Sequence, residues 1–187
     1  YSLSPGNVKD FYDEIKKSNP TSIISYTSNL YKICKYMENN NIYYKNSKLK
    51  GIILTSESVN DADIQLINKY LNSNVINEYG MAETGPIAYS KDETANIKVL
   101  WDSFIVTKKN NELVLSTIGN KLFPLINYVS EDKIVTKDIF KDSILSIEKI
   151  EGKCRNILKI PTINNEYKEV STILFDHIIK YYPNIFS

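Results

Sequence analysis

The stretch Asn77-Glu78-Tyr79-Gly80-Met81-Ala82-Glu83-Thr84-Gly85-Pro86 decides how we interpret the whole chain. It lies between two short apolar runs, Val75-Ile76 and Ile87-Ala88-Tyr89. A polar, glycine-bounded loop after a strand is where α/β proteins usually bind their ligand, at the carboxyl edge of the sheet. Glycines there permit unusual backbone angles and let a ligand approach the main chain. Glu83 would offer a carboxylate to a metal ion or a polar ligand; the alternative is a solvated turn.

The composition is that of an ordinary globular protein. The 187 residues can bury a core in one domain or in a domain plus a small lobe. The net charge of +1 gives no electrostatic reason to expect nucleic acid or an anionic membrane as a partner. No apolar run approaches the ~20 residues that span a bilayer. We therefore expect a cytoplasmic protein. The chain starts at Tyr1 with no signal-peptide pattern, so we expect an excised piece of something longer.

The cysteines and the histidine give no sign of a metal site. Cys34 and Cys154 are far apart and lack metal-ligand spacing, which favours free thiols in the cytoplasm over a disulfide. His177 is the lone histidine, so a cluster of histidine ligands is excluded. We expect His177 to pack as a structural residue and Cys34 to lie in the core.

The first half of the chain alternates short apolar strands with amphipathic helices. We predict helices over residues 7–17, 28–37 and 61–71, and strands over 21–26, 49–55 and 74–78. Asn7 and Ser28 are the expected helix caps, and the helix over 61–71 is expected to follow Asn60. Strands separated by helices imply right-handed crossovers, so we expect a parallel sheet with flanking helices over about residues 1–90. An antiparallel sheet here would instead favour an unrelated α/β binding module.

The pattern changes after residue 95, where strands predominate. We predict strands over residues 97–106, 112–118, 123–128, 133–136 and 144–150, with a polar turn at 108–111. Trp101 and Phe104 are expected to fill the core of this β-rich lobe. A helical stripe returns over residues 168–181. The expected division is an α/β part (1–94), a β-rich, barrel-like lobe (95–150) and the start of a small α+β lobe (151–187).

Segments spread along the chain resemble one enzyme family in the order in which they occur. Glu78-Tyr-Gly-Met-Ala-Glu-Thr-Gly-Pro86 resembles the Tyr-Gly-X-Thr-Glu signature of adenylate-forming enzymes, and most closely that of phenylacetate–coenzyme A ligase-like proteins. The approach Ser18-Asn-Pro20, the strand after it and Ser28-Asn-Leu-Tyr31 are similar to the segments that precede this signature in that branch. Gly51-Ile-Ile-Leu-Thr-Ser-Glu57 resembles the family strand that ends in Gly-Gly-Glu or Thr-Ser-Glu.

The resemblance continues through the second half. Asn111-Glu-Leu-Val-Leu-Ser-Thr117 is similar to the family strand Gly-Glu-Leu-Val-Val-Thr-Thr. Phe123-Pro-Leu-Ile-Asn-Tyr-Val-Ser-Glu-Asp132 resembles Met-Pro-Leu-Ile-Arg-Tyr-Arg-Thr-Gly-Asp. Glu151-Gly-Lys-Cys-Arg-Asn-Ile-Leu158 resembles the Gly-Arg-X-X-Asp hinge that precedes a small mobile domain. The likeness therefore covers nearly the whole chain.

The resemblance implies a two-step ligase reaction. A small carboxylic acid attacks the α-phosphate of ATP to give an acyl-adenylate and pyrophosphate. A thiol then takes the acyl group, either from coenzyme A or from the phosphopantetheine of a carrier protein. Charge crowding between carboxylate and triphosphate is the barrier, so Mg²⁺ and well-placed donors would promote the reaction.

The family's site residues map onto the following positions. Glu83 would be the catalytic carboxylate and the Mg²⁺ ligand. Tyr79 would stack on adenine and Asp132 would hold the ribose. The remaining expected nucleotide-binding residues are Ser56, Glu57, Gly80, Met81, Ala82 and Lys153. The resemblance requires Glu83 and Asp132 to face a common cleft.

Several positions depart from the family pattern. Ala82 replaces a Thr or Ser hydroxyl, and Asn127 and Val129 replace arginines. Glu131 replaces a glycine beside the ribose site. Lys153 replaces the hinge arginine, losing its planar fork, and Asn156 replaces the hinge aspartate. The phosphate loop would lie before Tyr1 and the catalytic lysine after Ser187. Two interpretations stay open: the central piece of an active ligase, or a degenerate homologue that binds a nucleotide or a partner without turnover.

Overall fold

The computed structural model describes residues 3, 6–45, 48–91, 94–153, 157–162 and 166–171. The chain divides into two compact units, Tyr1–Ser103 and Phe104–Ser187. We describe each unit by itself.

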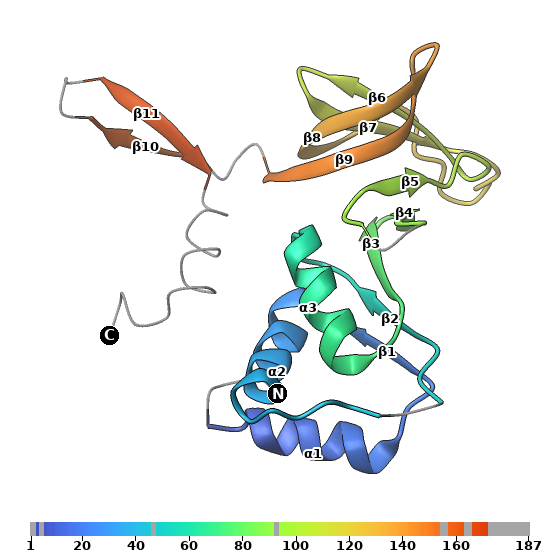
Figure 1. Cartoon of the computed structure of the whole chain (residues 1–187). Helices are drawn as coiled ribbons and strands as arrows, with labels where there is room; N and C mark the ends of the chain where they lie inside the picture. Colours follow the sequence, from blue (N-terminus) through green and yellow to red (C-terminus); the bar gives the residue numbers. More distant parts are fainter. Residues whose placement is uncertain are drawn as a thin grey trace. The chain divides into compact units, whose positions relative to one another are not determined.

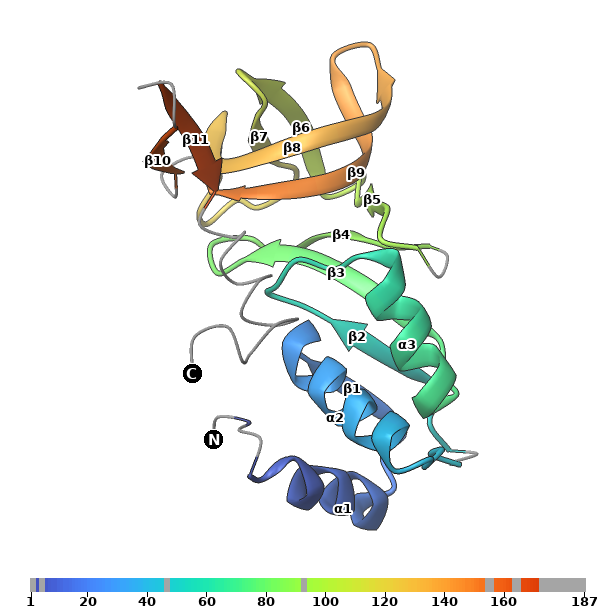
Figure 2. The ribbon, with the colours of Figure 1, turned by 60° about the vertical axis from the view of Figure 1, so that its left-hand side comes forward.

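The first unit contains three parallel strands and three helices in its described part (Figures 1 and 2). The elements alternate along the chain as α1 (Val8–Ser18), β1 (Ser22–Ser25), α2 (Thr27–Asn39), β2 (Gly51–Leu54), α3 (Asp61–Leu71) and β3 (Val75–Met81). The strand order is β1-β2-β3, and both pairings are parallel. The predicted parallel sheet is therefore confirmed, and no antiparallel pairing joins β1, β2 and β3 in the described residues between 21 and 78.

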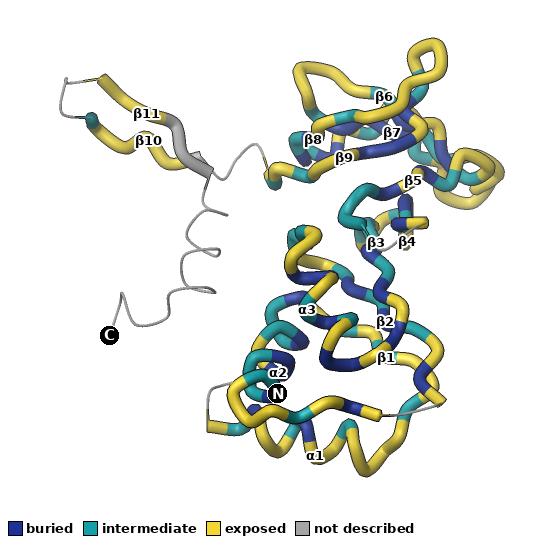
Figure 3. Tube along the Cα trace, viewed as in Figure 1, coloured by how far each residue is buried: buried dark blue, intermediate teal, exposed yellow. Residues whose placement is uncertain are grey.

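One face of these strands builds the core, because successive side chains on a strand point to opposite faces. Ile52, Leu54 and Val75 are at most 1% exposed and belong to the same cluster as the apolar stripes of the helices. Figure 3 shows these buried positions along β2, α2 and α3. Cys34 and Met37 are fully buried, as predicted.

The helix starts agree with the sequence in position but not always in capping chemistry. α3 follows Asn60 as predicted, and the Asn60 side chain caps the helix by accepting from the Asp63 backbone N–H at 2.9 Å. Asn7 occupies the N-cap of α1 without a side-chain cap bond. Ser28 was the wrong cap for α2, because Tyr26 occupies the N-cap position and Ser28 lies in the first turn.

The parallel strands continue into an antiparallel extension. β3 pairs with β4 (Gly85–Tyr89), which pairs with β5 (Ile97–Val99). β3 is longer than the predicted strand over 74–78 and runs through the motif to Met81. The buried Asn77 anchors this region, because its Nδ2 donates to the Ala95 carbonyl at 2.9 Å and its backbone N–H donates to Ser90 Oγ at 2.8 Å.

In the described part of the second unit, four antiparallel strands follow one another in space as β6-β7-β8-β9. They are β6 (Phe104–Lys109), β7 (Glu112–Thr117), β8 (Tyr128–Phe140) and β9 (Ser143–Lys153). The predicted turn is a two-residue hairpin in which Asn110 and Asn111 both have positive φ, the geometry that Asn tolerates best after Gly. β10 (Ile157–Pro161) and β11 (Tyr167–Ser171) form a separate hairpin.

Four sequence predictions in this half were wrong. The expected strand over 97–106 is broken by a turn, since the Ser103 N–H donates to the Leu100 carbonyl. Trp101 lies at that turn and is 74% exposed, whereas Phe104 is buried as expected. Residues 123–127 form an irregular, mostly exposed segment, and only Tyr128 of the expected strand belongs to one, as the first residue of β8. Residues 168–171 belong to β11, and the rest of the predicted helix, with His177, lies outside the described residues.

Candidate functional site

The motif from Asn77 to Pro86 forms a tight β-hairpin. β3 ends at Met81, β4 starts at Gly85, and Met81 pairs with Gly85. The turn is closed by the Thr84 N–H, which donates to the Met81 carbonyl at 3.2 Å. Gly85 has φ +70, the left-handed angle that ends many three-residue hairpin loops. Glu83 is exposed at the tip, where its carboxylate lies outside the packed core.

Gly80 is required for space and not for its backbone angle. Its φ lies outside the left-handed region, unlike that of Gly85. A Cβ at Gly80 would lie 2.6 Å from the Gly85 carbonyl oxygen and 2.9 Å from Pro86 Cα. The expectation that both glycines adopt unusual angles is therefore wrong for Gly80. The close approach it permits is that of the neighbouring strand β4.

The other predicted residues of the hairpin differ in exposure. Tyr79 and Met81 are half-buried, and Ala82 is exposed beside Glu83. A register shift between Tyr79 and Gly80 marks a bulge in the ladder. Bulges re-aim side chains and occur often beside active sites. The structure thus brings Tyr79, Gly80, Met81, Ala82 and Glu83 together at one end of β3.

Ser56 and Glu57 lie in the turn after β2, and Glu57 has a structural partner. Its carboxylate accepts from the Ser28 backbone N–H at 2.7 Å and from Ser28 Oγ at 2.8 Å. The N-cap residue of α2, Tyr26, makes no side-chain cap bond. Glu57 instead accepts from one of the backbone N–H groups in the first turn of α2 that have no partner within the helix. Ser56 adopts a left-handed angle, φ +66, which allows the chain to turn there.

A polar row crosses three neighbouring strands, and the sequence did not reveal it. Thr55 Oγ1 donates to Glu78 Oε1 at 2.8 Å, and Glu78 is the direct cross-strand neighbour of Tyr89. Burial, followed by the hydrogen bond to Glu78 and the charge of Glu78, raises the pKa of the Tyr89 hydroxyl. Glu78 directly precedes the motif tyrosine, but only the register of β2 against β3 shows that it faces Thr55.

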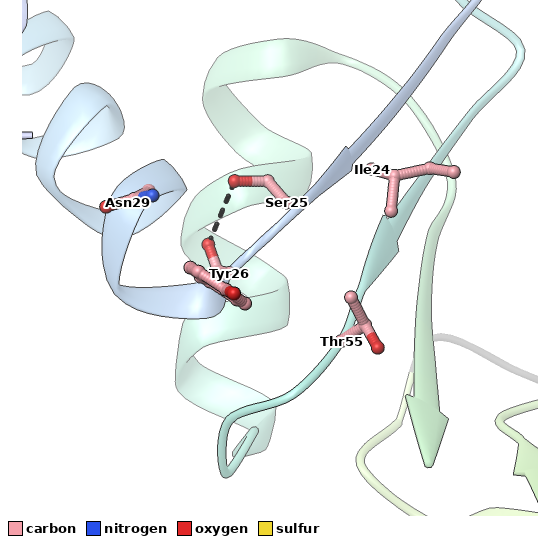
Figure 4. Close-up of a pocket in the computed structure, with 5 residues that line it drawn as sticks. All are labelled: Ile24, Ser25, Tyr26, Asn29 and Thr55. Carbon is pink, nitrogen blue, oxygen red and sulfur yellow. Dashed lines mark hydrogen bonds between the residues drawn. The ribbon is translucent and has the colours of Figure 1, made fainter. Parts of the chain in front are cut away.

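A pocket opens beside this row, at the carboxyl ends of β1 and β2 (Figure 4). Its volume is about 280 Å³, and it is lined by Ile24, Ser25, Tyr26, Asn29 and Thr55. Figure 4 shows Asn29 on the first turn of α2 and Thr55 just beyond β2. The carboxyl edge of parallel strands is the usual binding position in α/β sheets.

In the second unit the structure brings together Asp132 and Lys153, both predicted to bind nucleotide. Lys153 Nζ lies 3.6 Å from Asp132 Oδ1 and donates to the Ser130 carbonyl at 2.8 Å. Asp132 is 7% exposed, and its backbone N–H donates to Ser130 Oγ. Glu131, which stands where the family has glycine, has φ +64. The backbone therefore keeps the left-handed conformation that glycine would adopt most easily.

The described residues restrict how a metal ion could be held. No group of three His, Cys, Asp or Glu side chains among them is arranged to bind one. A single carboxylate such as Glu83 still fits Mg²⁺, which commonly takes one or two protein carboxylates and completes its shell with phosphates and water.

Within the described ranges, no helix combines the length and apolar character needed to cross a bilayer.

No protein-family model and no curated protein sequence matches the chain. Solved structures do match. 2-Hydroxyisobutyryl-CoA ligase in complex with R3-HIB-AMP matches with a TM-score of 0.67 and 13% identity, over 96% of this chain and 41% of that one. Anthranilate CoA ligase AuaEII in complex with anthranoyl-AMP gives 0.67 and 11%, over 98% and 38%. Coronafacic acid ligase from Pectobacterium brasiliense gives 0.57 and 20%, over 96% and 38%.

These similarities concern the fold, because all the identities are low. The chain spans about two-fifths of the length of the structures that it matches. The hairpin and the pocket described above therefore lie in a fold that these ligase structures also contain. The fold of the chain is similar to part of the fold of these ligases.

Proposed function

We propose that the chain is part of an ATP-dependent ligase that activates a small carboxylic acid as an acyl-adenylate and transfers it to a thiol. The acceptor would be coenzyme A or a phosphopantetheine-bearing carrier protein, and the compartment the cytoplasm. The observation that supports this most is the β3–β4 hairpin, which holds Tyr79 through Glu83 within a fold that matches acyl-CoA ligases. The phenylacetate–coenzyme A ligase-like branch remains our assignment from the motifs.

In this proposal the hairpin residues act on the nucleotide. Glu83, exposed at the tip, is assigned to Mg²⁺, which when bound would offset the negative charge of the phosphates. Tyr79 is assigned to adenine. The backbone around Gly80, Met81 and Ala82 is assigned to the phosphates. Ser56 is assigned to the adenine side from the turn after β2, and Glu57 supports this turn through Ser28.

Asp132 is assigned to bind the ribose hydroxyls of the nucleotide. Lys153 is assigned to hold the Asp132 carboxylate in position. A carboxylate is a strong acceptor for paired hydroxyls. The contact between Lys153 and Asp132, together with the bond from Lys153 to the Ser130 carbonyl, restricts the position of Asp132. Lys153 can do this as a point charge although it lacks the fork of the family's arginine.

ATP–pyrophosphate exchange tests the proposal. The assay uses the polypeptide in which these 187 residues naturally occur, with a panel of small carboxylic acids. We expect acid-dependent exchange that Glu83→Gln abolishes and that Glu14→Gln, an exposed site on α1, leaves unchanged. Equal exchange in the wild type and the Glu83→Gln variant would contradict the role of Glu83.

A degenerate homologue is the second candidate, because Ala82 offers no side-chain donor at the hairpin tip. The nearby hydroxyl of Thr84 donates instead to the Gly85 carbonyl at 2.9 Å. Loss of one donor costs on the order of 1–3 kcal/mol of stabilisation if nothing replaces it. AMP binding that Asp132→Asn weakens, without exchange for any acid in the panel, would favour this candidate.

A further inference from the structure

The pocket at the ends of β1 and β2 is lined by hydroxyl groups whose protons are already used within the protein, and Thr55 is the first of these. A hydroxyl has one proton to donate and can accept two bonds. Thr55 Oγ1 lies 2.8 Å from Glu78 Oε1, and an ionised carboxylate only accepts, so the Thr55 proton is directed to Glu78. Thr55 also lines the pocket. Toward a ligand in the pocket, Thr55 can therefore act as an acceptor.

A second hydroxyl in the lining, that of Ser25, also donates its proton within the protein. Ser25 Oγ donates to the Tyr26 carbonyl oxygen at 3.1 Å, so its proton is also engaged within the protein. Its remaining lone pairs can accept from a ligand. Two lining hydroxyls, one from the last residue of β1 and one from the residue after β2, can thus accept hydrogen bonds from a ligand.

The negative charge of Glu78, next to Thr55, also favours a ligand group that donates a hydrogen bond. Glu78 accepts from Thr55 and lies beside Tyr89 on the next strand. Lys and Arg are absent from the described residues that line the pocket. A ligand group that brings a proton or a positive charge is favoured here, whereas a second carboxylate would be repelled.

The size and the apolar walls of the pocket suit a small acid. A volume of about 280 Å³ lies just below the range of pockets for drug-sized ligands, roughly 300–1,000 Å³. Ile24 is 68% exposed and Tyr26 is 51% exposed, so both offer apolar surface to a ligand. The pocket therefore combines apolar surface from Ile24 and Tyr26 with the acceptor oxygens of Ser25 and Thr55.

We propose that this pocket takes the acyl group of a small acid that carries a hydroxyl or ammonium group, and that Thr55, oriented by Glu78, selects for that donor. This inference rests on the proposed function for the identity of the ligand as an acid. Thr55 contacts the ligand, and Glu78 is a positioning residue that acts through Thr55.

The test compares matched acids on the 187-residue chain. NMR titration measures dissociation constants for meta-hydroxybenzoate, meta-(aminomethyl)benzoate, meta-methoxybenzoate and meta-methylbenzoate. We expect the hydroxyl and ammonium compounds to bind about three- to tenfold more tightly than the methoxy and methyl compounds, the value of one hydrogen bond. Shifts in the amides of Ser25, Asn29 and Thr55 would locate the binding. Equal affinities, or no binding at millimolar concentration, would overturn the proposal.

Variants of Thr55 and Glu78 distinguish a loss of ligand preference from a loss of folding. Thr55→Val removes the acceptor at nearly constant volume and should abolish the preference, and Thr55→Ser should restore it. Glu78→Gln should reduce the preference, because an amide can donate to Thr55 and release its proton toward the ligand. Glu14→Gln is the control for loss of one carboxylate. Preservation of the full preference in Thr55→Val would overturn the role of Thr55, provided that its thermal transition remains cooperative.

The failure of this inference is distinguishable from failure of the proposed function. Donor-selective binding without ATP–pyrophosphate exchange in the natural polypeptide would keep the pocket assignment and remove the ligase. Exchange with acids that lack a donor group, at rates equal to those of donor-bearing acids, would keep the ligase and remove the selectivity.

Discussion

Glu57 and Ser28, which are 29 residues apart in the sequence, form two hydrogen bonds of 2.7 and 2.8 Å at the start of α2. The carboxylate accepts from both the backbone N–H and the hydroxyl of Ser28. A negative charge at a helix N-terminus is stabilised by the helix dipole as well as by these bonds. Glu57 therefore connects the turn after β2 to the helix that precedes it.

Replacing Glu57 with Ala should lower the free energy of unfolding by about 1–2 kcal/mol, the usual effect of losing an N-terminal cap. Urea denaturation followed by circular dichroism measures this change. Glu14→Ala, on the exposed face of α1, is the matched control and should change stability by less than about 0.5 kcal/mol. A loss in Glu57→Ala no larger than that of the control would contradict a capping role.

Gly80→Ala should destabilise the β3–β4 hairpin by about 1–3 kcal/mol. The added Cβ would lie 2.6 Å from the Gly85 carbonyl oxygen, and backbone atoms cannot move aside as a flexible side chain can. Thermal unfolding measures the loss. Gly6→Ala is the control, since an added Cβ there meets nothing within 4 Å. Equal transition temperatures for the two variants would show that the hairpin can open at Gly80.

Glu131→Gly should be more stable than Glu131→Ala by about 1 kcal/mol, because the residue has φ +64 and a Cβ is disfavoured in the left-handed region. Both variants remove the same carboxylate, so the comparison isolates the backbone effect. Denaturant unfolding of the two proteins checks it. If Glu131→Ala proves the more stable of the two, the left-handed angle at this position is incorrect.

The Cys34 thiol should be unreactive in the folded protein. Burial is the main cause that raises its pKa from 9.0 to about 12, and the charge of Glu38 adds to the shift. A Cys154→Ser variant, which keeps Cys34 as the one thiol, should react with a thiol reagent at pH 8 only after denaturation. Rapid labelling of the native protein would contradict the buried position.

The same shift gives a pH dependence of stability. The neutral thiol is favoured in the fold, so its contribution is fully present below pH 9 and is lost as the pH rises toward about 12. Cys34→Ala should remove this part of the alkaline loss while lowering stability at neutral pH. Denaturant unfolding at several pH values, wild type against variant, measures both effects. An unchanged alkaline profile would contradict the assignment to Cys34.

The sequence was sufficient for the elements whose pattern is local. The stripe of Ile64, Ile67 and Leu71 after Asn60 predicted α3 with its correct bounds, because the helix period depends on neighbouring residues. The alternation of strands and helices predicted the parallel sheet for a similar reason. The motif around Tyr79 and Glu83 also directed attention to the correct end of β3.

Only the tertiary structure decided which distant groups meet. Thr55 faces Glu78, Glu57 accepts from Ser28 in the first turn of α2, and Lys153 contacts Asp132 because strand register and turn geometry bring them together. A shift of register by one residue would turn each of these strand side chains to the opposite face, and no local pattern encodes that choice. Trp101 shows the same limit: its apolar character predicted burial, but the turn between β5 and β6 leaves it exposed. Local propensity therefore determined the elements, while long-range pairing determined the chemistry that they present.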